Sequence, residues 1–358
     1  MSTRGSLLRL ARHLRGFTQK KSAERLGIAQ AVYSRMENEL VEIDDAVVAK
    51  ASTVFDLPTE FFELKDTIYG PPVSVHTMLR GNSQVTTRDV DMITAELNLR
   101  LVHLRRFLEN VDLNHSLEIP KLDIEQYDSP ADIAVIVRRH WQIPFGPIKN
   151  LTRLLERAGV IIGYSDFRGA SVSGVTFSAP GQPPLILLNS GHQADRVRFT
   201  LAHELGHLVM HRFPTPEMER EANEFASALL FPRQDLRAAL RGRRVNLALL
   251  AALKPEWKMS VQGILYAAQR EKIVTKNQAR YLWTQISSRG WKTNEPPSLD
   301  FEHDPPTVLP TIIKAMFDDL GVDKSEVLQL ARVHEAEFDR LYPMEKDPPT
   351  RPRLRIVN

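Results

Sequence analysis

Two histidines four residues apart, with a glutamate directly after the first, form an HExxH pattern at His203, Glu204 and His207. In a helix these histidines lie about 40° apart around the axis, so both rings can converge on one ion. Neutral imidazole suits zinc, and three protein ligands leave room for a water molecule that a base can deprotonate. The pattern therefore predicts a zinc (Zn2+) site with Glu204 as the general base of amide hydrolysis.

The third ligand is expected in the next helix, which carries four glutamates. The apolar face of that helix is formed by Met218, Ala222, Phe225, Ala226 and Leu229. Glu219 falls inside this arc and Glu221 lies at its edge, whereas the other two glutamates point away. Because a buried carboxylate needs a stabilising partner such as a cation, we predict Glu219 as the ligand, with Glu221 as the alternative. Asn223 is predicted to hydrogen-bond the ligating carboxylate.

His211 continues the four-residue spacing of the histidines. A histidine at the end of a helix more often caps it or interacts with its dipole, so His211 is not included among the predicted ligands. The alternative for the acidic helix is that all four of its glutamates simply solvate its surface.

The elements that must position these residues are short. Three apolar runs bounded by Gly, Pro, Ser or Asn predict the strands of a small sheet, at 160–162, 172–177 and 185–188. Helices are predicted around them at 129–141, 147–159, 193–212 and 215–232. A long amphipathic helix over 87–110, with Leu97, Leu101, Leu104 and Leu108 as its buried stripe, is predicted before them. Helical patterns return at 234–290 and 309–341.

The sequence around the HExxH pattern resembles the ImmA/IrrE family of metallopeptidases. The resemblance rests on segments 195–207, 219–226 and 229–232, and extends over about residues 130–290. It implies His203, His207 and Glu219 as zinc ligands and Glu204 as the general base. It also implies a helix at 147–151 and an edge strand at 185–189, to which a peptide substrate could add. Phe231 replaces the methionine expected before Pro232, which is a conservative packing change.

Residues 17–37 resemble the XRE, or Cro/repressor-type, helix-turn-helix. Ala23 supplies the small residue and Gly27 the turn between the two helices. This resemblance implies that the second helix reads base edges in the major groove of double-stranded DNA. The predicted DNA-binding residues are Lys20, Gln30, Ala31, Tyr33, Ser34 and Arg35. Lys20 is expected to contact phosphates together with Lys21 and Arg12, and the others to lie on or near the exposed face of the second helix.

Charge is unevenly placed in this N-terminal region. Residues 1–35 contain eight basic residues and one acidic residue, and residues 36–64 contain eight acidic residues and one basic residue. One end of the module is therefore suited to phosphates. Since the module is neutral as a whole, a protein-binding domain without DNA affinity is the alternative.

The 358 residues suffice for two or three domains, and 42% hydrophobic with 25% charged residues is typical of globular proteins. Without cysteine, no disulfide or Cys-bound zinc is possible. The sequence shows no membrane-length apolar run and no signal peptide, so a cytoplasmic location is expected. The expected domains are a helix-turn-helix domain (1–66), a helical connector (67–128), a peptidase-like domain (129–235), a helical extension (236–292) and a Pro-interrupted helical region with a basic tail (293–358).

The predicted fold class is mainly α, with a small α+β zincin-like domain between an all-α N-terminal domain and a helical C-terminal region. The predicted function is a homodimeric, DNA-binding transcriptional regulator whose zinc endopeptidase domain cleaves a repressor, toxin or other partner in a stress or mobile-element response. The alternative is a transcription factor or antitoxin whose peptidase-like domain is a non-catalytic sensor or scaffold. The presence of Glu204 favours catalysis.

Overall fold

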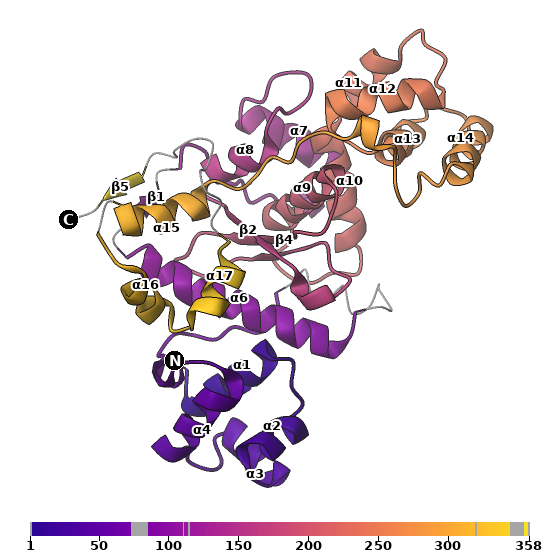
Figure 1. Cartoon of the computed structure of the whole chain (residues 1–358). Coiled ribbons are helices and arrows are strands. Elements are labelled where there is room, and N and C mark those ends of the chain that lie inside the picture. The colour runs from indigo at the N-terminus through magenta and orange to yellow at the C-terminus, as the bar shows by residue number, and fades with distance from the viewer. Residues whose placement is uncertain are drawn as a thin grey trace.

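The computed structural model describes residues 2–72, 85–109, 111–113, 115–318, 321–343 and 354–356. The fold is mainly α with a small sheet at its centre, as the sequence predicts (Figure 1). Within the described ranges, no helix combines the length and the apolar character needed to cross a membrane.

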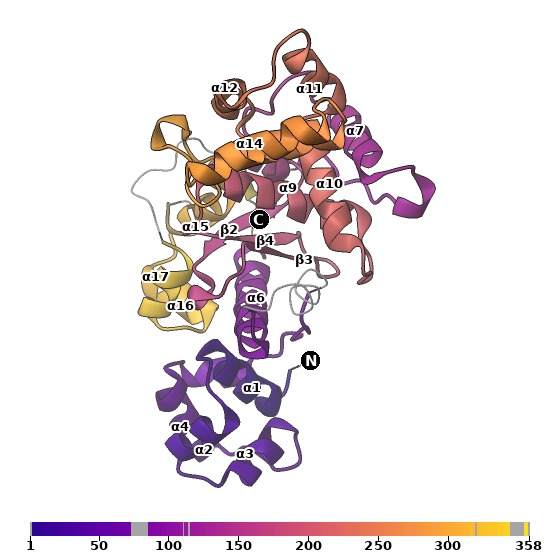
Figure 2. The same ribbon diagram turned by 90° about the vertical axis from the view of Figure 1, so that its right-hand side faces the viewer.

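The N-terminal module consists of five short helices. They are α1 (Arg4–Leu14), α2 (Gln19–Leu26), α3 (Gln30–Glu37), α4 (Asp45–Phe55) and the 3-10 helix η1 (Thr59–Glu63). A capping box at Thr3 begins α1, and Gly27, with φ of +71°, ends α2 in the left-handed conformation that glycine favours. The module lies at one end of the molecule, against α6 (Thr87–Phe107) (Figure 2).

Helix α6 is buried on every side from Ala95 to Leu104, not along one stripe as the sequence predicted. The sheet lies over one of its faces, and α1, α15 (Val308–Asp318) and α16 (Lys324–Ala331) cover others. The predicted stripe is therefore only part of its contact surface, because segments far apart in the sequence surround this helix. Polar residues inside it must then find partners in the interior.

The main sheet has three strands in the order β2 (Ile161–Ser165), β4 (Leu185–Asn189), β3 (Gly174–Phe177). β2 is parallel to β4 and β3 is antiparallel to it. The expectation of an edge strand at 185–189 is wrong: this strand is central, which fits an apolar run that is buried on both faces. Within the described residues, the free edge next to the HExxH helix belongs to β3.

Helices cover the face of the sheet opposite α6. They are α7 (Pro130–His140), α8 (Leu151–Arg157), α9 (Ala194–Met210) and α10 (Met218–Leu230). α8 begins later than the sequence predicted, because the Asn150 side chain caps its first turn by accepting a hydrogen bond from the backbone N–H of Arg153. The extension consists of α11 (Arg233–Leu240), α12 (Leu247–Trp257), α13 (Val261–Arg270) and α14 (Lys276–Ser288), at the end opposite the N-terminal module (Figure 1).

From α14 the chain returns as an extended arm to α15, α16 and α17 (Glu335–Leu341), beside α6 (Figure 1). Lys254 fixes this arm: its buried ammonium lies 2.9 Å from carboxylate oxygens of both Asp195 and Glu295. The predicted basic tail is partly a strand, since β5 (Leu354–Ile356) pairs antiparallel with β1 (Val111–Leu113). Its residues Lys346, Arg351 and Arg353 lie outside the described residues.

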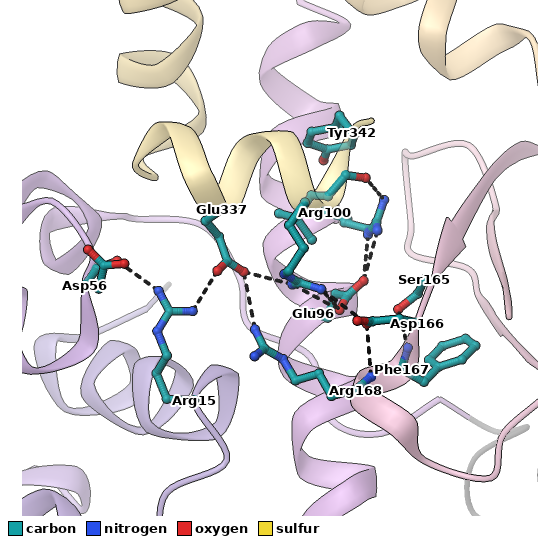
Figure 3. A network of polar contacts seen from close by, with 12 residues as sticks. Arg15, Asp56, Glu96, Arg100, Ser165, Asp166, Phe167, Arg168, Glu337 and Tyr342 are labelled. Atoms are coloured by element: carbon teal, nitrogen blue, oxygen red, sulfur yellow. Dashed lines mark hydrogen bonds and ion pairs between the residues drawn. The ribbon is translucent and has the colours of Figure 1, made fainter. Parts of the chain in front are cut away.

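A buried polar network joins the N-terminal module, α6, the sheet and α17 (Figure 3). Arg100 of α6, 1% exposed, donates hydrogen bonds to Glu96 at 2.9 Å and to the backbone carbonyls of Tyr164 and Leu341 at 2.8 and 3.0 Å. Beside it, Glu337 of α17 accepts hydrogen bonds from Arg15 at 2.8 Å and from Arg340 at 2.8 Å. The network thus ties four parts of the chain together.

We expect Arg100→Met to lower the free energy of unfolding by about 3–5 kcal/mol, because it removes the closer of the two arginine partners of the buried Glu96 carboxylate and leaves two backbone carbonyls without this donor. Urea denaturation followed by circular dichroism measures this. Arg220→Met is the control, since Arg220 is exposed and pairs with Glu217 at the surface; it should change stability by less than about 1 kcal/mol. Equal effects of the two substitutions would contradict a central role for Arg100.

Candidate metal centre and DNA-binding surface

The HExxH residues lie on α9, and α10 packs closely against it. Gly206 permits this approach: a Cβ at that position would lie 3.1 Å from the Phe225 ring and 3.3 Å from the Ala222 Cα. Even a methyl group there would require the neighbouring atoms to shift by a few tenths of an ångström. The small residue inside the HExxH pattern therefore lets α10 carry its acidic side chains to the histidines.

Three possible donor groups converge between these helices. The Nε2 atoms of His203 and His207 lie 3.0 Å apart, and each lies 3.4 Å from a carboxylate oxygen of Glu219. The ligand atoms of the three residues all fall within 4.8 Å of one another. Two imidazoles and one carboxylate make up a ligand set of catalytic zinc sites, so the cluster fits this ion.

The electrostatics of the cluster show how strongly its members interact. Burial raises the pKa of the Glu219 carboxyl, but hydrogen bonds with His203 and His207 outweigh this effect and hold the pKa well below its usual range. Burial lowers the pKa of His203, but the hydrogen bond with Glu219 and the charge of Glu204 raise it above the ordinary value. Both shifts favour an ionised Glu219 carboxylate next to positive charge.

Further side chains orient the two rings. Asn223 Oδ1 lies 3.1 Å from His203 Nδ1, so this amide contacts the ring of a histidine in the cluster, a contact that the sequence did not predict. His207 Nδ1 lies 2.9 Å from His211 Nδ1, and His211 Nε2 lies 3.1 Å from Glu221. Glu221, the alternative ligand, thus faces His211 and is not part of the cluster. Such contacts fix which nitrogen of a ring faces the ion.

Sequence reasoning missed the orienting role of His211. Its side chain is 2% exposed, and burial together with the neighbouring His207 lowers its pKa to about 4. The continued four-residue spacing of the histidines was the signal that could have revealed it, because that spacing stacks His211 against His207.

Glu204 lies at the junction of α9 and β3. It is 1% exposed, and its Oε2 atom accepts a hydrogen bond of 2.6 Å from the Thr176 hydroxyl. Thr176 belongs to β3, so the sheet fixes the orientation of this carboxylate. No local pattern could reveal this contact, since 28 positions separate the two residues.

The second helix of the helix-turn-helix presents only part of the predicted surface. Lys20, Gln30, Ala31 and Arg35 are exposed, and Ser34 is half-buried. DNA would approach a module of this kind over the exposed residues of its second helix.

The prediction of Tyr33 as a DNA-binding residue is wrong, because the structure buries its side chain completely. It belongs to the inner face of α3 together with Met36 and Glu37, and burial raises the pKa of its hydroxyl. Arg12 is also turned inward: its Nε donates a 2.6 Å hydrogen bond to Glu37. The residue therefore links α1 to α3 and is not available for the phosphate contact that the sequence predicted.

The fold and the side chains together define a helix-turn-helix protein with a peptidase-like domain that carries a His-His-Glu cluster. Comparison with family models agrees: residues 8–62 match the helix-turn-helix family HTH_3, and residues 155–269 match Peptidase_M78, the IrrE N-terminal-like domain. The chain thus joins an XRE-type helix-turn-helix to an IrrE/ImmA-like peptidase-family domain. The curated proteins contain no match to it.

We expect His203→Ala, His207→Ala and Glu219→Gln each to weaken zinc binding strongly, because each removes one of three donors. Asn223→Ala should weaken it by about 10- to 100-fold through the loss of ring orientation. Competitive titration with a chelator and metal analysis after dialysis measure both effects. Glu217→Gln, directly before α10, is the control. Glu217 pairs with Arg220, so this substitution should leave zinc affinity unchanged. Full affinity in Glu219→Gln would exclude this cluster as the metal site.

Proposed function

We propose that this protein is a DNA-binding transcriptional regulator whose second domain is a zinc-dependent endopeptidase that cleaves a repressor, toxin or other regulatory protein. The observation that carries the proposal is the convergence of His203, His207 and Glu219 beside a glutamate that Thr176 holds in place. Zinc bound by these residues would supply Lewis-acid activation of water and of the substrate carbonyl group.

Glu204 is suited to move the proton. Its Oε2 atom is engaged by Thr176, which leaves Oε1 to accept a proton from the attacking water and deliver it to the leaving amide nitrogen. The burial of Glu204 keeps bulk water from competing for that proton. His211 and Asn223 act as positioning residues through the rings of His207 and His203.

The free edge of β3 supports a peptide as the substrate. An extended chain can add to such an edge through backbone hydrogen bonds, and β3 carries Thr176, the partner of the proposed base. Helix α3 supports double-stranded DNA as the other partner. A homodimer on two half-sites is the arrangement that we propose for the bound state, since modules of this type pair on operators.

We expect Glu204→Gln to lower turnover of cleaved peptides by about 10²–10⁴-fold, because it removes the base and keeps the shape of the site. Mass spectrometry of a proteome-derived peptide library incubated with the zinc-loaded protein measures this. Zinc content and DNA affinity serve as controls and should not change. Undiminished cleavage by Glu204→Gln would contradict the assigned role, and a zinc-loaded protein that cleaves no peptide would favour a sensor or scaffold.

Gln30→Ala and Arg35→Ala should each weaken binding to a selected operator by about 1–3 kcal/mol, because their exposed side chains are placed to contact base edges. The operator is identified by selection from random duplexes, and affinity is measured by fluorescence anisotropy. Tyr33→Phe is the matched control on the same helix and should retain affinity, because Tyr33 is buried. Normal binding by Arg35→Ala would place the DNA elsewhere on the module.

A further inference from the structure

A cavity of about 600 Å³ opens beside the metal centre. One wall is formed by His207, Leu208 and Val209 at the end of α9 together with His211 and Arg212, and another by Thr176–Ser178 at the end of β3. Because these walls carry the partner of Glu204 and one of the metal-site histidines, the cavity is the place where a substrate of the proposed peptidase would bind. The inference below rests on that proposed function.

The third wall is a strap, defined here as residues Asp66–Pro72, which leads out of the N-terminal module. Asp66 is held by Arg105 and Arg106 at 3.1 and 2.9 Å. The backbone N–H of Tyr69 donates to Asn98 at 2.6 Å, and its carbonyl accepts from the same side chain at 2.9 Å. The Tyr69 ring lies 5.3 Å from that of Phe177. The cavity therefore has walls that are formed before any substrate arrives.

Two cations line this cavity without a counterion. Lys121 and Arg212 form no ion pair within the described residues, and the described part of the lining contains no aspartate or glutamate. The Lys121 ammonium donates a 2.5 Å hydrogen bond to the carbonyl of Leu208 in the last turn of α9, which holds it at the cavity. Capping of α9 explains this bond, but it does not explain the second cation beside it.

The two cations are close enough to repel each other. Desolvation lowers the pKa of Lys121, and the charge of Arg212 lowers it further. Like charges held together in this way are stabilised when an anionic group binds between them. Because both cations line the cavity, an acidic side chain of a substrate in this cavity would bind between them.

We propose that Lys121 and Arg212 bind an acidic side chain of an extended substrate peptide, so that the peptidase selects sequences with aspartate or glutamate near the scissile bond. The peptide lies between the strap and the end of β3. Selectivity of this kind acts on binding, because both cations line the cavity and neither belongs to the His-His-Glu cluster or is the proposed base.

The test uses a peptide library cleaved by the full-length, zinc-loaded protein, with cleavage sites read by mass spectrometry. Asp and Glu should be enriched at one position near the scissile bond. Peptides that differ only by Glu or Gln there should differ by about five- to tenfold in KM, with kcat little changed, as expected for a charge-assisted contact that is partly exposed. Binding of the same peptide pair to Glu204→Gln, measured by fluorescence anisotropy, should show the same ratio without turnover.

Charge reversal provides the decisive variants. Arg212→Glu alone, and Lys121→Glu together with Arg212→Glu, should abolish the preference for acid or turn it into one for Lys and Arg. Arg212 is exposed, so its single variant is expected to fold. The double variant Arg241→Glu, Arg244→Glu is the control, because it changes the net charge by the same amount as the double variant in the cavity. Both residues are exposed and outside the described cavity lining. This control variant should retain the preference for acidic residues.

The outcomes separate this inference from the proposed function. Cleavage without a preference for acid, or an acid preference that survives both reversed variants, overturns the substrate-binding role of Lys121 and Arg212 and leaves the peptidase intact. Acid-selective binding by a protein that cleaves nothing supports the binding site and overturns the peptidase.

Discussion

The Arg100 guanidinium lies in the interior of the molecule, where a charged group is stable only if its hydrogen bonds are satisfied. Three chain segments satisfy them: α6 through Glu96, the end of β2 through the Tyr164 carbonyl, and the end of α17 through the Leu341 carbonyl (Figure 3). Because each partner comes from a different part of the sequence, the charge can be buried only when all three are assembled. Arg100 therefore links the sheet to the C-terminal helices.

The N-terminal module joins the same assembly through a second charged group. Glu337 of α17 lies between Arg15 of the module and Arg340, and 3.5 Å from Arg168 near the end of β2 (Figure 3). Neighbouring arginines outweigh the effect of burial and keep the pKa of this carboxyl below its ordinary value. The chain connection at the end of the module is thus not its sole link to the rest of the described structure. The ion pair between Arg15 and Glu337 also joins it to α17.

Features that depend on local periodicity could be predicted from the sequence. The HExxH spacing and the apolar arc around Glu219 predict side chains that do converge in the structure, because each pattern lies within one helix. Contacts between distant segments could not be predicted in this way. The bond of Thr176 to Glu204 and the surroundings of α6 follow from the tertiary arrangement alone. Tyr33 was misplaced because a short helix offers few positions from which to tell its inner face from its outer one.

The two hydrogen bonds between Asn98 and Tyr69 have a mechanical consequence. Asp66 is fixed to the end of α6 and Tyr69 to its middle, so the chain that leaves the helix-turn-helix has no slack before it reaches the metal-site cavity. A turn of the N-terminal module relative to α6 would therefore strain the ion pairs of Asp66 before it moved Tyr69 and the cavity wall. The N-terminal module and the cavity beside the His-His-Glu cluster are thus joined by one short segment, Asp66–Pro72.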